Sequence, residues 1–253
     1  MILNTFNLEG KVAIITGCNR GLGQGIAIGL AQAGCNIVGV SSSGSEVTKT
    51  KVEALGRQFI DIRANLMVLD DIPTIIKSTL EQFGQVDILV NNAGIIRRDD
   101  AIDFSESDWD DVMNINLKTT FFLCQAVAKQ FIAQGNGGKI INIASMLSFQ
   151  GGIRVPSYTA SKSGVAGLTK LMANEWAKHG INVNAIAPGY MATDNTKQLR
   201  SDEKRNQEIL DRIPADRWGT PSDLAGPSVF LASEASNYIN GFTMAVDGGW
   251  LAR

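Results

Sequence analysis

The sequence predicts an α/β fold: a single-domain, Rossmann-like, doubly wound parallel sheet of about seven strands, with helices on both faces. Two observations predict it. Short apolar runs rich in β-branched residues alternate along the whole chain with segments of helical length, so successive strands must pair in parallel through crossovers. In addition, a cluster of glycines directly follows the first apolar run, as at the first strand-to-helix turn of such sheets.

The strands and helices are expected in strict alternation. The expected strands are residues 11–16, 36–40, 58–62, 86–92, 139–145, 181–188 and 243–246. The first expected helix follows the glycine cluster and ends near Gly34. The others span residues 46–55, 70–83, 107–134, about 158 to 178–180, and 222–232, and the polar segment 193–213 is also expected to be helical. A Ser-x-x-Asp pattern at Ser107 and Asp110 predicts the N-cap of the long helix 107–134.

Composition narrows the function. The 253 residues are 44% hydrophobic and contain no linker-like stretch, so we expect one domain over residues 1–253. Lys and Arg number 23 against 25 Asp and Glu, a net charge of −2, and no basic block suits a phosphate backbone or an anionic membrane. Neither nucleic acid nor a membrane is an expected partner. The start of the chain lacks a signal-peptide pattern, which favours a cytoplasmic location.

The metal-binding residue types are few. The three cysteines, Cys18, Cys35 and Cys124, are widely spaced and odd in number, so neither a disulfide framework nor a Cys-x-x-Cys site is indicated. His179 is the only histidine. We therefore expect no bound metal.

The chemistry is expected in residues 145–162. Tyr158 and Lys162 are four residues apart, which places the phenol and the ammonium on one face of a helix. A cation about 4 Å from a phenol contributes roughly 4 kcal/mol at an effective dielectric near 20, or about three pKa units before screening. Such a tyrosine can exchange a proton near neutral pH. Taken alone, the same spacing also occurs on ordinary solvent-exposed helix faces.

The glycine cluster gives a second site. Gly17, Gly21 and Gly23 lie between the first expected strand and helix, where glycines let the backbone approach a pyrophosphate. Turn formation alone is the alternative interpretation of such a cluster.

Six motifs in order carry a resemblance. They are T-G-x-x-x-G-x-G at 16–23, N-N-A-G at 91–94, N-L-K at 116–118, a serine thirteen residues before Tyr158, Y-x-x-x-K at 158–162, and P-G-x-x-x-T at 188–193. Over nearly its whole length the chain resembles the short-chain dehydrogenase/reductase family. Longer segments, among them IIRRDD and VDGGWLAR, resemble a subgroup that acts on keto-deoxy sugar acids.

The resemblance implies a role for each motif. Tyr158 would be the general acid/base, and Lys162 would lower its pKa and bind the nicotinamide ribose. Ser145 would hydrogen-bond the substrate oxygen, and Asn116 would position Lys162 and a water. The implied cofactor site comprises Gly17, Asn19, Arg20, Gly21, Leu22, Gly23, Ser41, Asn65, Leu66, Asn92, Ala93, Gly94, Tyr158, Lys162, Pro188, Gly189, Met191 and Thr193.

The choice of cofactor depends on the end of the second strand. Ser41 to Ser43 offer no carboxylate to grip a ribose 2′-hydroxyl, and Arg20 is placed to pair with a 2′-phosphate or to lie on the surface. The resemblance implies NAD, and these residues leave NADP open.

An arginine is expected to hold the substrate carboxylate, because a guanidinium can meet it with two parallel hydrogen bonds. Arg154 is ranked first because glycines precede it in the loop before Tyr158, and Arg97 and Arg98 follow the N-N-A-G turn. The expected substrate site therefore contains Ser145, Gln150, Arg154, Tyr158 and Arg97, with Met191 nearby. The alternative for each arginine is a solvated surface position.

Three rival functions differ in the residues that they require. A serine hydrolase would need His179 beside Ser145, but this histidine lies seventeen residues beyond Lys162, about 26 Å along the same expected helix. A non-catalytic nucleotide-binding regulator would not need the full catalytic set. An NADPH-dependent reductase of another carbonyl compound stays open. The resemblance also implies a homotetramer, paired through the helices around 116–134 and 158–179 and through the last strand and tail.

Overall fold

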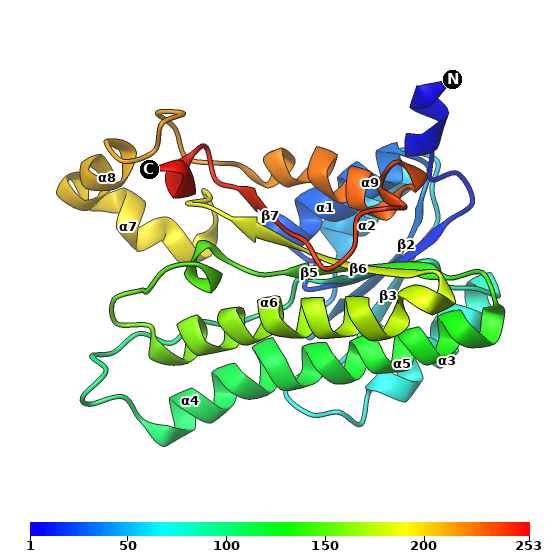
Figure 1. Cartoon of the computed structure of the whole chain (residues 1–253), viewed down its shortest axis with the longest axis horizontal. Coiled ribbons are helices and arrows are strands. Elements are labelled where there is room, and N and C mark those ends of the chain that lie inside the picture. The colour runs from blue at the N-terminus through cyan, green and yellow to red at the C-terminus, as the bar shows by residue number, and fades with distance from the viewer.

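The computed structural model describes residues 1–253 and contains one sheet of seven parallel strands in the order β3-β2-β1-β4-β5-β6-β7 (Figure 1). The strands are β1 Val12–Thr16, β2 Asn36–Ser41, β3 Phe59–Arg63, β4 Ile88–Asn91, β5 Gly138–Ile143, β6 Ile181–Pro188 and β7 Thr243–Val246. All seven expected strands are present, and the predicted fold class is confirmed. The strand order reverses direction between β1 and β4, where doubly wound sheets bind their ligands.

Helices cover both faces of the sheet (Figure 1). One layer contains α1, α2 and α9, and the other contains α3, α5 and α6. The helices are α1 Gly21–Gln32, α2 Glu46–Glu53, α3 Ile72–Phe83, α4 Glu106–Met113, α5 Thr119–Gln134, α6 Pro156–Trp176, α7 Lys197–Ser201, α8 Glu203–Leu210 and α9 Ala225–Ala232. Both layers hide the central strands from water, and every residue of β1 is buried.

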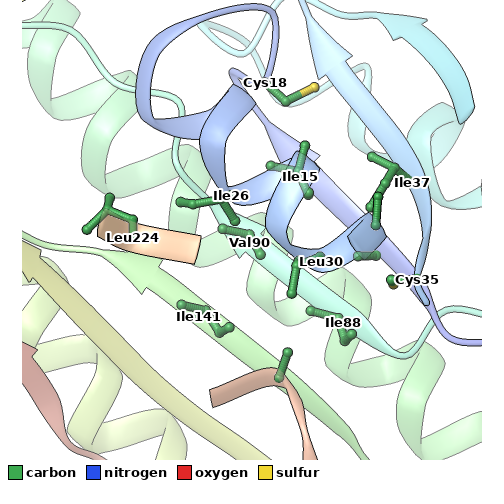
Figure 2. Close-up of a cluster of buried hydrophobic side chains, with 14 of the residues drawn as sticks. Ile15, Cys18, Ile26, Leu30, Cys35, Ile37, Ile88, Val90, Ile141 and Leu224 are labelled. Atoms are coloured by element: carbon green, nitrogen blue, oxygen red, sulfur yellow. The ribbon is translucent and has the colours of Figure 1, made fainter. Parts of the chain in front are cut away.

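The core has one large cluster on each side of the sheet. Figure 2 shows the cluster between the sheet and α1, in which Ile26 and Leu30 of α1 lie over Ile15, Val90 and Ile141 of three strands. The second cluster joins β1, β4 and β5 to α3, α5 and α6. These two clusters fix the strand ends at which the site is built.

The long helix expected at 107–134 differs in two ways. It begins at Glu106 with Ser105 as its N-cap, whose hydroxyl accepts a hydrogen bond from the Asp108 amide, so the predicted cap at Ser107 is wrong by two residues. Both serines precede an acidic residue by three positions, so the pattern did not distinguish them. A π-helical turn at Asn114–Lys118 then separates α4 from α5.

Other segments differ less from the predicted helices. The polar segment 193–213 forms a 3₁₀ turn at Asp194–Thr196 followed by α7 and α8. Helix α6 continues as a 3₁₀ turn to His179 and stops at Gly180, whose φ of 73° is left-handed, as the sequence predicts. A 3₁₀ turn at Ile2–Phe6 was not expected.

None of the helices is long and apolar enough to cross a membrane. The three cysteines are free and buried, and no group of His, Cys, Asp and Glu side chains is arranged to hold a metal.

Candidate active site

A cavity of about 510 Å³ lies at the carboxyl ends of the central strands. It is bordered by the loops after β1, β2, β3 and β4, by α6, and by the segment that follows β6. Of the residues expected in the site, it is lined by Gly17, Asn19, Arg20, Gly21, Leu22, Ser41, Asn65, Leu66, Asn92, Ala93, Gly94, Tyr158, Lys162 and Thr193. The fold thus brings together most of the expected cofactor residues.

The glycine loop after β1 leaves no room for side chains. Gly17 and Gly21 have φ values of 66° and 55°, in the left-handed region that favours glycine. A Cβ on Gly23 would lie 2.3 Å from the Gly17 carbonyl oxygen. Gly23 does not line the cavity itself, but it lets α1 start directly beneath the loop. This is the cradle that a pyrophosphate needs at a helix N-terminus.

The loop is tied to the end of β4. The Thr16 hydroxyl accepts hydrogen bonds from the backbone amides of Asn92 and Ala93, and the Asn92 side chain donates to the carbonyls of Thr16 and Gly17. Asn92 therefore holds two neighbouring strand ends in register at the point where the strand order reverses.

The end of β2 carries no carboxylate. Ser41, Ser42 and Ser43 line the cavity, and the Asn19 side chain donates to the Ser43 hydroxyl. Arg20 also lines the cavity and forms a 3.0 Å ion pair with Asp194, in the segment after β6. The residues fit the ribose and phosphates of a nicotinamide dinucleotide, and nothing at β2 repels a 2′-phosphate.

The expected catalytic side chains come from two elements. Ser145 follows β5, and Tyr158 and Lys162 lie one turn apart near the start of α6. The Lys162 Nζ donates a 2.6 Å hydrogen bond to the Ile143 carbonyl and lies 5.7 Å from the centre of the Tyr158 ring. The predicted common helix face is therefore present.

Burial controls the titration of both groups. Loss of hydration raises the pKa of Tyr158 above its usual value, and the Ser145 hydroxyl and the positive charge of Arg98 only partly oppose this rise. Burial also lowers the pKa of Lys162 to about 8. Burial thus outweighs the opposing effects of Ser145 and Arg98 on the Tyr158 pKa, and the expected lowering of this pKa by Lys162 stays a prediction.

Asn116 lies in the π-helical turn and is buried. Its side-chain oxygen accepts from the Ile95 amide, and its nitrogen donates to the Ile95 carbonyl and to the Ser161 hydroxyl. It makes no hydrogen bond to Lys162. Asn116 therefore joins the loop after β4 to α6 next to Lys162, and its expected role in positioning Lys162 and a water stays a prediction.

The three arginines considered for the substrate differ in their partners. Arg154, at a φ of 62°, lies 3.6 Å from Asp99 and 3.0 Å from Asp100. Arg97 is similarly paired, at 3.1 Å to Asp108 and 3.2 Å to Asp111. Arg98 has no carboxylate partner.

Instead, the guanidinium of Arg98 donates to the Asn195 carbonyl, and its charge acts on Tyr158. The ranking of Arg154 first is therefore not supported by the pairing, since two aspartates already neutralise it.

Several expected residues lie outside the cavity. Met191 is buried in the core and bridges to Gly219, and Gly189 packs against Asp247, so with Pro188 they shape the exit of β6. Gln150 is bound by Trp250. Sequence reasoning missed Asp194 and Asn195, which line the cavity, because no motif distinguishes them in the polar segment after Thr193. His179 is exposed and lies outside the cavity, which leaves Ser145 without a histidine.

This geometry defines a class. A cavity over a glycine loop, bordered by a Tyr-x-x-x-Lys helix with a serine beside it, suits proton and hydride exchange with a nicotinamide cofactor. The family model described as short chain dehydrogenase matches residues 11–204. The chain belongs to the short-chain dehydrogenase family and is an NAD(P)-dependent oxidoreductase.

The names of individual relatives specify a substrate. The chain is 70% identical to the 2-dehydro-3-deoxy-D-gluconate 5-dehydrogenase of Escherichia coli, over the whole of both chains. A crystal structure of a putative 2-deoxy-D-gluconate 3-dehydrogenase from Agrobacterium tumefaciens with bound NADP is 56% identical, with a TM-score of 0.91, covering 99% of this chain and 100% of that one. A gluconate 5-dehydrogenase from Burkholderia cenocepacia, in complex with NADP and tartrate, is 38% identical, with a TM-score of 0.94 over both whole chains.

Proposed function

We propose that the protein exchanges a hydride between a nicotinamide cofactor and a keto-deoxy sugar acid, as a 2-dehydro-3-deoxy-D-gluconate 5-dehydrogenase. The observation that carries this proposal is the 70% identity, over the whole of both chains, to an enzyme of that name. The cavity supports it, because Tyr158 and Lys162 line it and the Ser145 hydroxyl lies beside Tyr158.

Tyr158 moves the proton in this proposal. When bound, the cofactor supplies or accepts the hydride at the reacting carbon. The Tyr158 hydroxyl then gives its proton to the carbonyl oxygen during reduction and takes it back during oxidation. Because burial raises the pKa of Tyr158, the hydroxyl is protonated at neutral pH, ready for the reductive direction.

Ser145 and Lys162 support this step. The Ser145 hydroxyl donates to the oxygen that gains negative charge, which stabilises the transition state. Lys162, with its amine fixed by the Ile143 carbonyl, is placed to hold the nicotinamide ribose and to favour the ionised form of Tyr158. Asn116 holds the loop that follows β4 against α6.

We assign the substrate carboxylate to Arg98. A guanidinium without a carboxylate partner can bind a carboxylate with two hydrogen bonds, and Arg98 would leave only the Asn195 carbonyl, whereas Arg97 and Arg154 would have to leave two aspartates each. Arg98 is also the arginine whose charge reaches Tyr158, so an acid bound to it lies next to the proton donor.

Both cofactor forms suit the site. The three serines after β2 offer hydroxyls to a ribose 2′-hydroxyl and no charge against a 2′-phosphate. NAD stays the default, and the ratio of kcat/KM for NAD and NADP measures the preference.

We also propose that residues 1–253 act as one domain within a cytoplasmic homotetramer. A groove of about 320 Å³ on the outer faces of α5 and α6 exposes Ile132 and Leu171 beside Phe121 and Trp176, which suits a two-fold contact between copies. Light scattering should give the mass of four chains, and a monomer mass at working concentration would contradict this assembly.

The function is tested by a substrate screen. Keto-deoxy-uronates and deoxy-gluconates are offered with each cofactor, and the absorbance of the reduced nicotinamide is followed. We expect turnover of 2-dehydro-3-deoxy-D-gluconate with the oxidised cofactor, and of its 5-keto oxidation product with the reduced cofactor. Turnover only with carbonyl compounds that lack a carboxylate would make the protein a reductase of another class.

A further inference from the structure

The last turn of the chain touches the loop that carries Ser145. Trp250 begins a 3₁₀ turn after β7, and only 4% of its surface is exposed. Its indole nitrogen donates a 3.3 Å hydrogen bond to the side-chain oxygen of Gln150, a hundred residues earlier. Gln150 lies five residues after Ser145, and its backbone N–H donates to the Met146 carbonyl. The end of the chain thus reaches the loop between Ser145 and Tyr158.

Trp250 is itself held firmly. The Arg212 guanidinium lies 4.0 Å from its ring, and the Tyr190 ring packs edge-on at 4.7 Å. Arg253 donates to the carbonyls of Asp211 and Arg212 at the end of α8. In Figure 1 this C-terminal turn, drawn in red, lies beside α7 and α8. The indole therefore has a fixed place between the Ser145 loop and the helical segment after β6.

The chemistry of the contact fixes the orientation of the Gln150 amide. An indole N–H can only donate, so it must face the amide oxygen. The amide nitrogen then points away from Trp250, and it makes no hydrogen bond within the chain. The side chain of Gln150 is half-buried, so its NH₂ group has no partner in the chain and is open to solvent or to a bound molecule.

We propose that Trp250 is a positioning residue that orients the Gln150 NH₂ group to donate a hydrogen bond to an oxygen of the sugar acid. The proposal rests on the proposed function, because a polyhydroxylated acid supplies the acceptor that the amide lacks. A carbonyl substrate without hydroxyl or carboxylate groups would not use it.

A double-mutant cycle tests the proposal. Gln150→Leu removes the donor and should raise the KM for the sugar acid about tenfold, as for one lost hydrogen bond. Trp250→Phe keeps an aromatic ring but frees the amide, and should raise this KM about threefold. The double variant should match Gln150→Leu alone, since Trp250 acts only through Gln150. The kcat and the dissociation constant of the cofactor should stay within twofold in all three.

Trp218→Phe is the matched control. Trp218 belongs to the same aromatic group, at 5.4 Å from the Tyr190 ring, and its indole also donates to a side-chain oxygen, that of Asn206. Its indole makes no hydrogen bond to Gln150. This variant should leave the KM for the acid within twofold, although it loses an equivalent hydrogen bond.

A second variant removes the donor but keeps the indole contact. Gln150→Glu retains an oxygen acceptor for Trp250 and replaces NH₂ by a second oxygen, so the KM should rise at least as much as in Gln150→Leu. A wild-type KM in Gln150→Glu would overturn the donor assignment. The positioning role would be overturned if the two increases in KM multiplied in the double variant. It would also be overturned if Trp218→Phe raised the KM as much as Trp250→Phe. A wild-type protein without sugar-acid turnover would instead overturn the proposed function.

Discussion

The cofactor side and the substrate side of the cavity are held by different kinds of contact. On the cofactor side, left-handed glycines and partly buried hydrogen bonds between Thr16 and Asn92 fix the backbone itself. On the substrate side, loops are joined by exposed ion pairs such as Arg154 with Asp100, whose side chains are 56% and 63% accessible. Exposed pairs contribute about 0–1 kcal/mol each. We therefore expect substitutions in the loops of the proposed substrate side to cost less stability than substitutions in the glycine loop.

The largest effect is expected where the two sides meet. Tyr158→Phe removes the proton donor and should lower kcat by about 10² to 10⁴, the usual contribution of general acid catalysis. Cofactor affinity, measured by quenching of protein fluorescence, should be unchanged. Retained carbonyl reduction with normal cofactor binding would refute the role of Tyr158.

On the substrate side, Arg98→Ala should raise the KM for the acid by about 30-fold or more, because losing the partner of a bound charge costs about 2 to 5 kcal/mol. Arg154→Ala, which loses only an exposed ion pair, should change this KM by less than about fivefold. Steady-state kinetics with the sugar acid compares the two variants. A larger effect in Arg154→Ala would instead make Arg154 the residue that binds the substrate carboxylate.

The buried Lys162 is expected to cost stability at neutral pH. Its pKa of about 8 lies below the ordinary 10.5, so below pH 8 the folded chain carries a charge that burial disfavours. Lys162→Met should raise the free energy of unfolding at pH 7 by up to about 3 kcal/mol while abolishing turnover.

This advantage should shrink as the pH rises from 8 toward 10.5, because there the folded wild type has released the proton that the unfolded chain still binds. Urea unfolding at pH 7 and pH 9.5 measures both values. A variant less stable than the wild type at pH 7 would show that the hydrogen bond to Ile143 outweighs the burial of charge.

On the cofactor side, Gly23→Ala adds a methyl group 2.3 Å from the Gly17 oxygen. Overpacking of this kind costs about 1 to 3 kcal/mol, and the shifted loop should weaken the binding of either cofactor. Thermal melting with and without cofactor separates the two losses. Gly226→Ala is the control, because a Cβ there would meet no atom within 4 Å.

The smallest effect on cofactor binding is expected at the rim of the cavity. Asp194→Asn breaks the exposed ion pair with Arg20 and frees this guanidinium for a 2′-phosphate. The affinity for NADP relative to NAD should rise severalfold, within the range of about 1 kcal/mol for exposed pairs. Isothermal titration with both cofactors measures the ratio, and an unchanged ratio would mean that Arg20 takes no part in the choice.

The same contrast explains what the sequence could predict. The strands and the glycine loop depend on local patterns, and β6 and β7 begin and end where the periodicity places them. The pairing of Arg154 with Asp99 and Asp100 joins residues more than fifty positions apart, and only the folded loops bring them together. The pKa of Tyr158 depends on burial, which spacing along a helix does not reveal. Trp250 likewise reaches Gln150 only through the fold.

The π-helical turn at Asn114–Lys118 has a consequence for changes in chain length. Removing one residue from a regular α-helix rotates everything beyond it by about 100° and would turn a packed face toward water. A turn that already holds one extra residue can lose it and return to the regular pitch, so α5 would keep its contacts with the sheet. Only Asn116 would swing away from Ile95 and Ser161. We therefore expect a one-residue deletion in this turn to lower turnover more than it lowers the melting temperature.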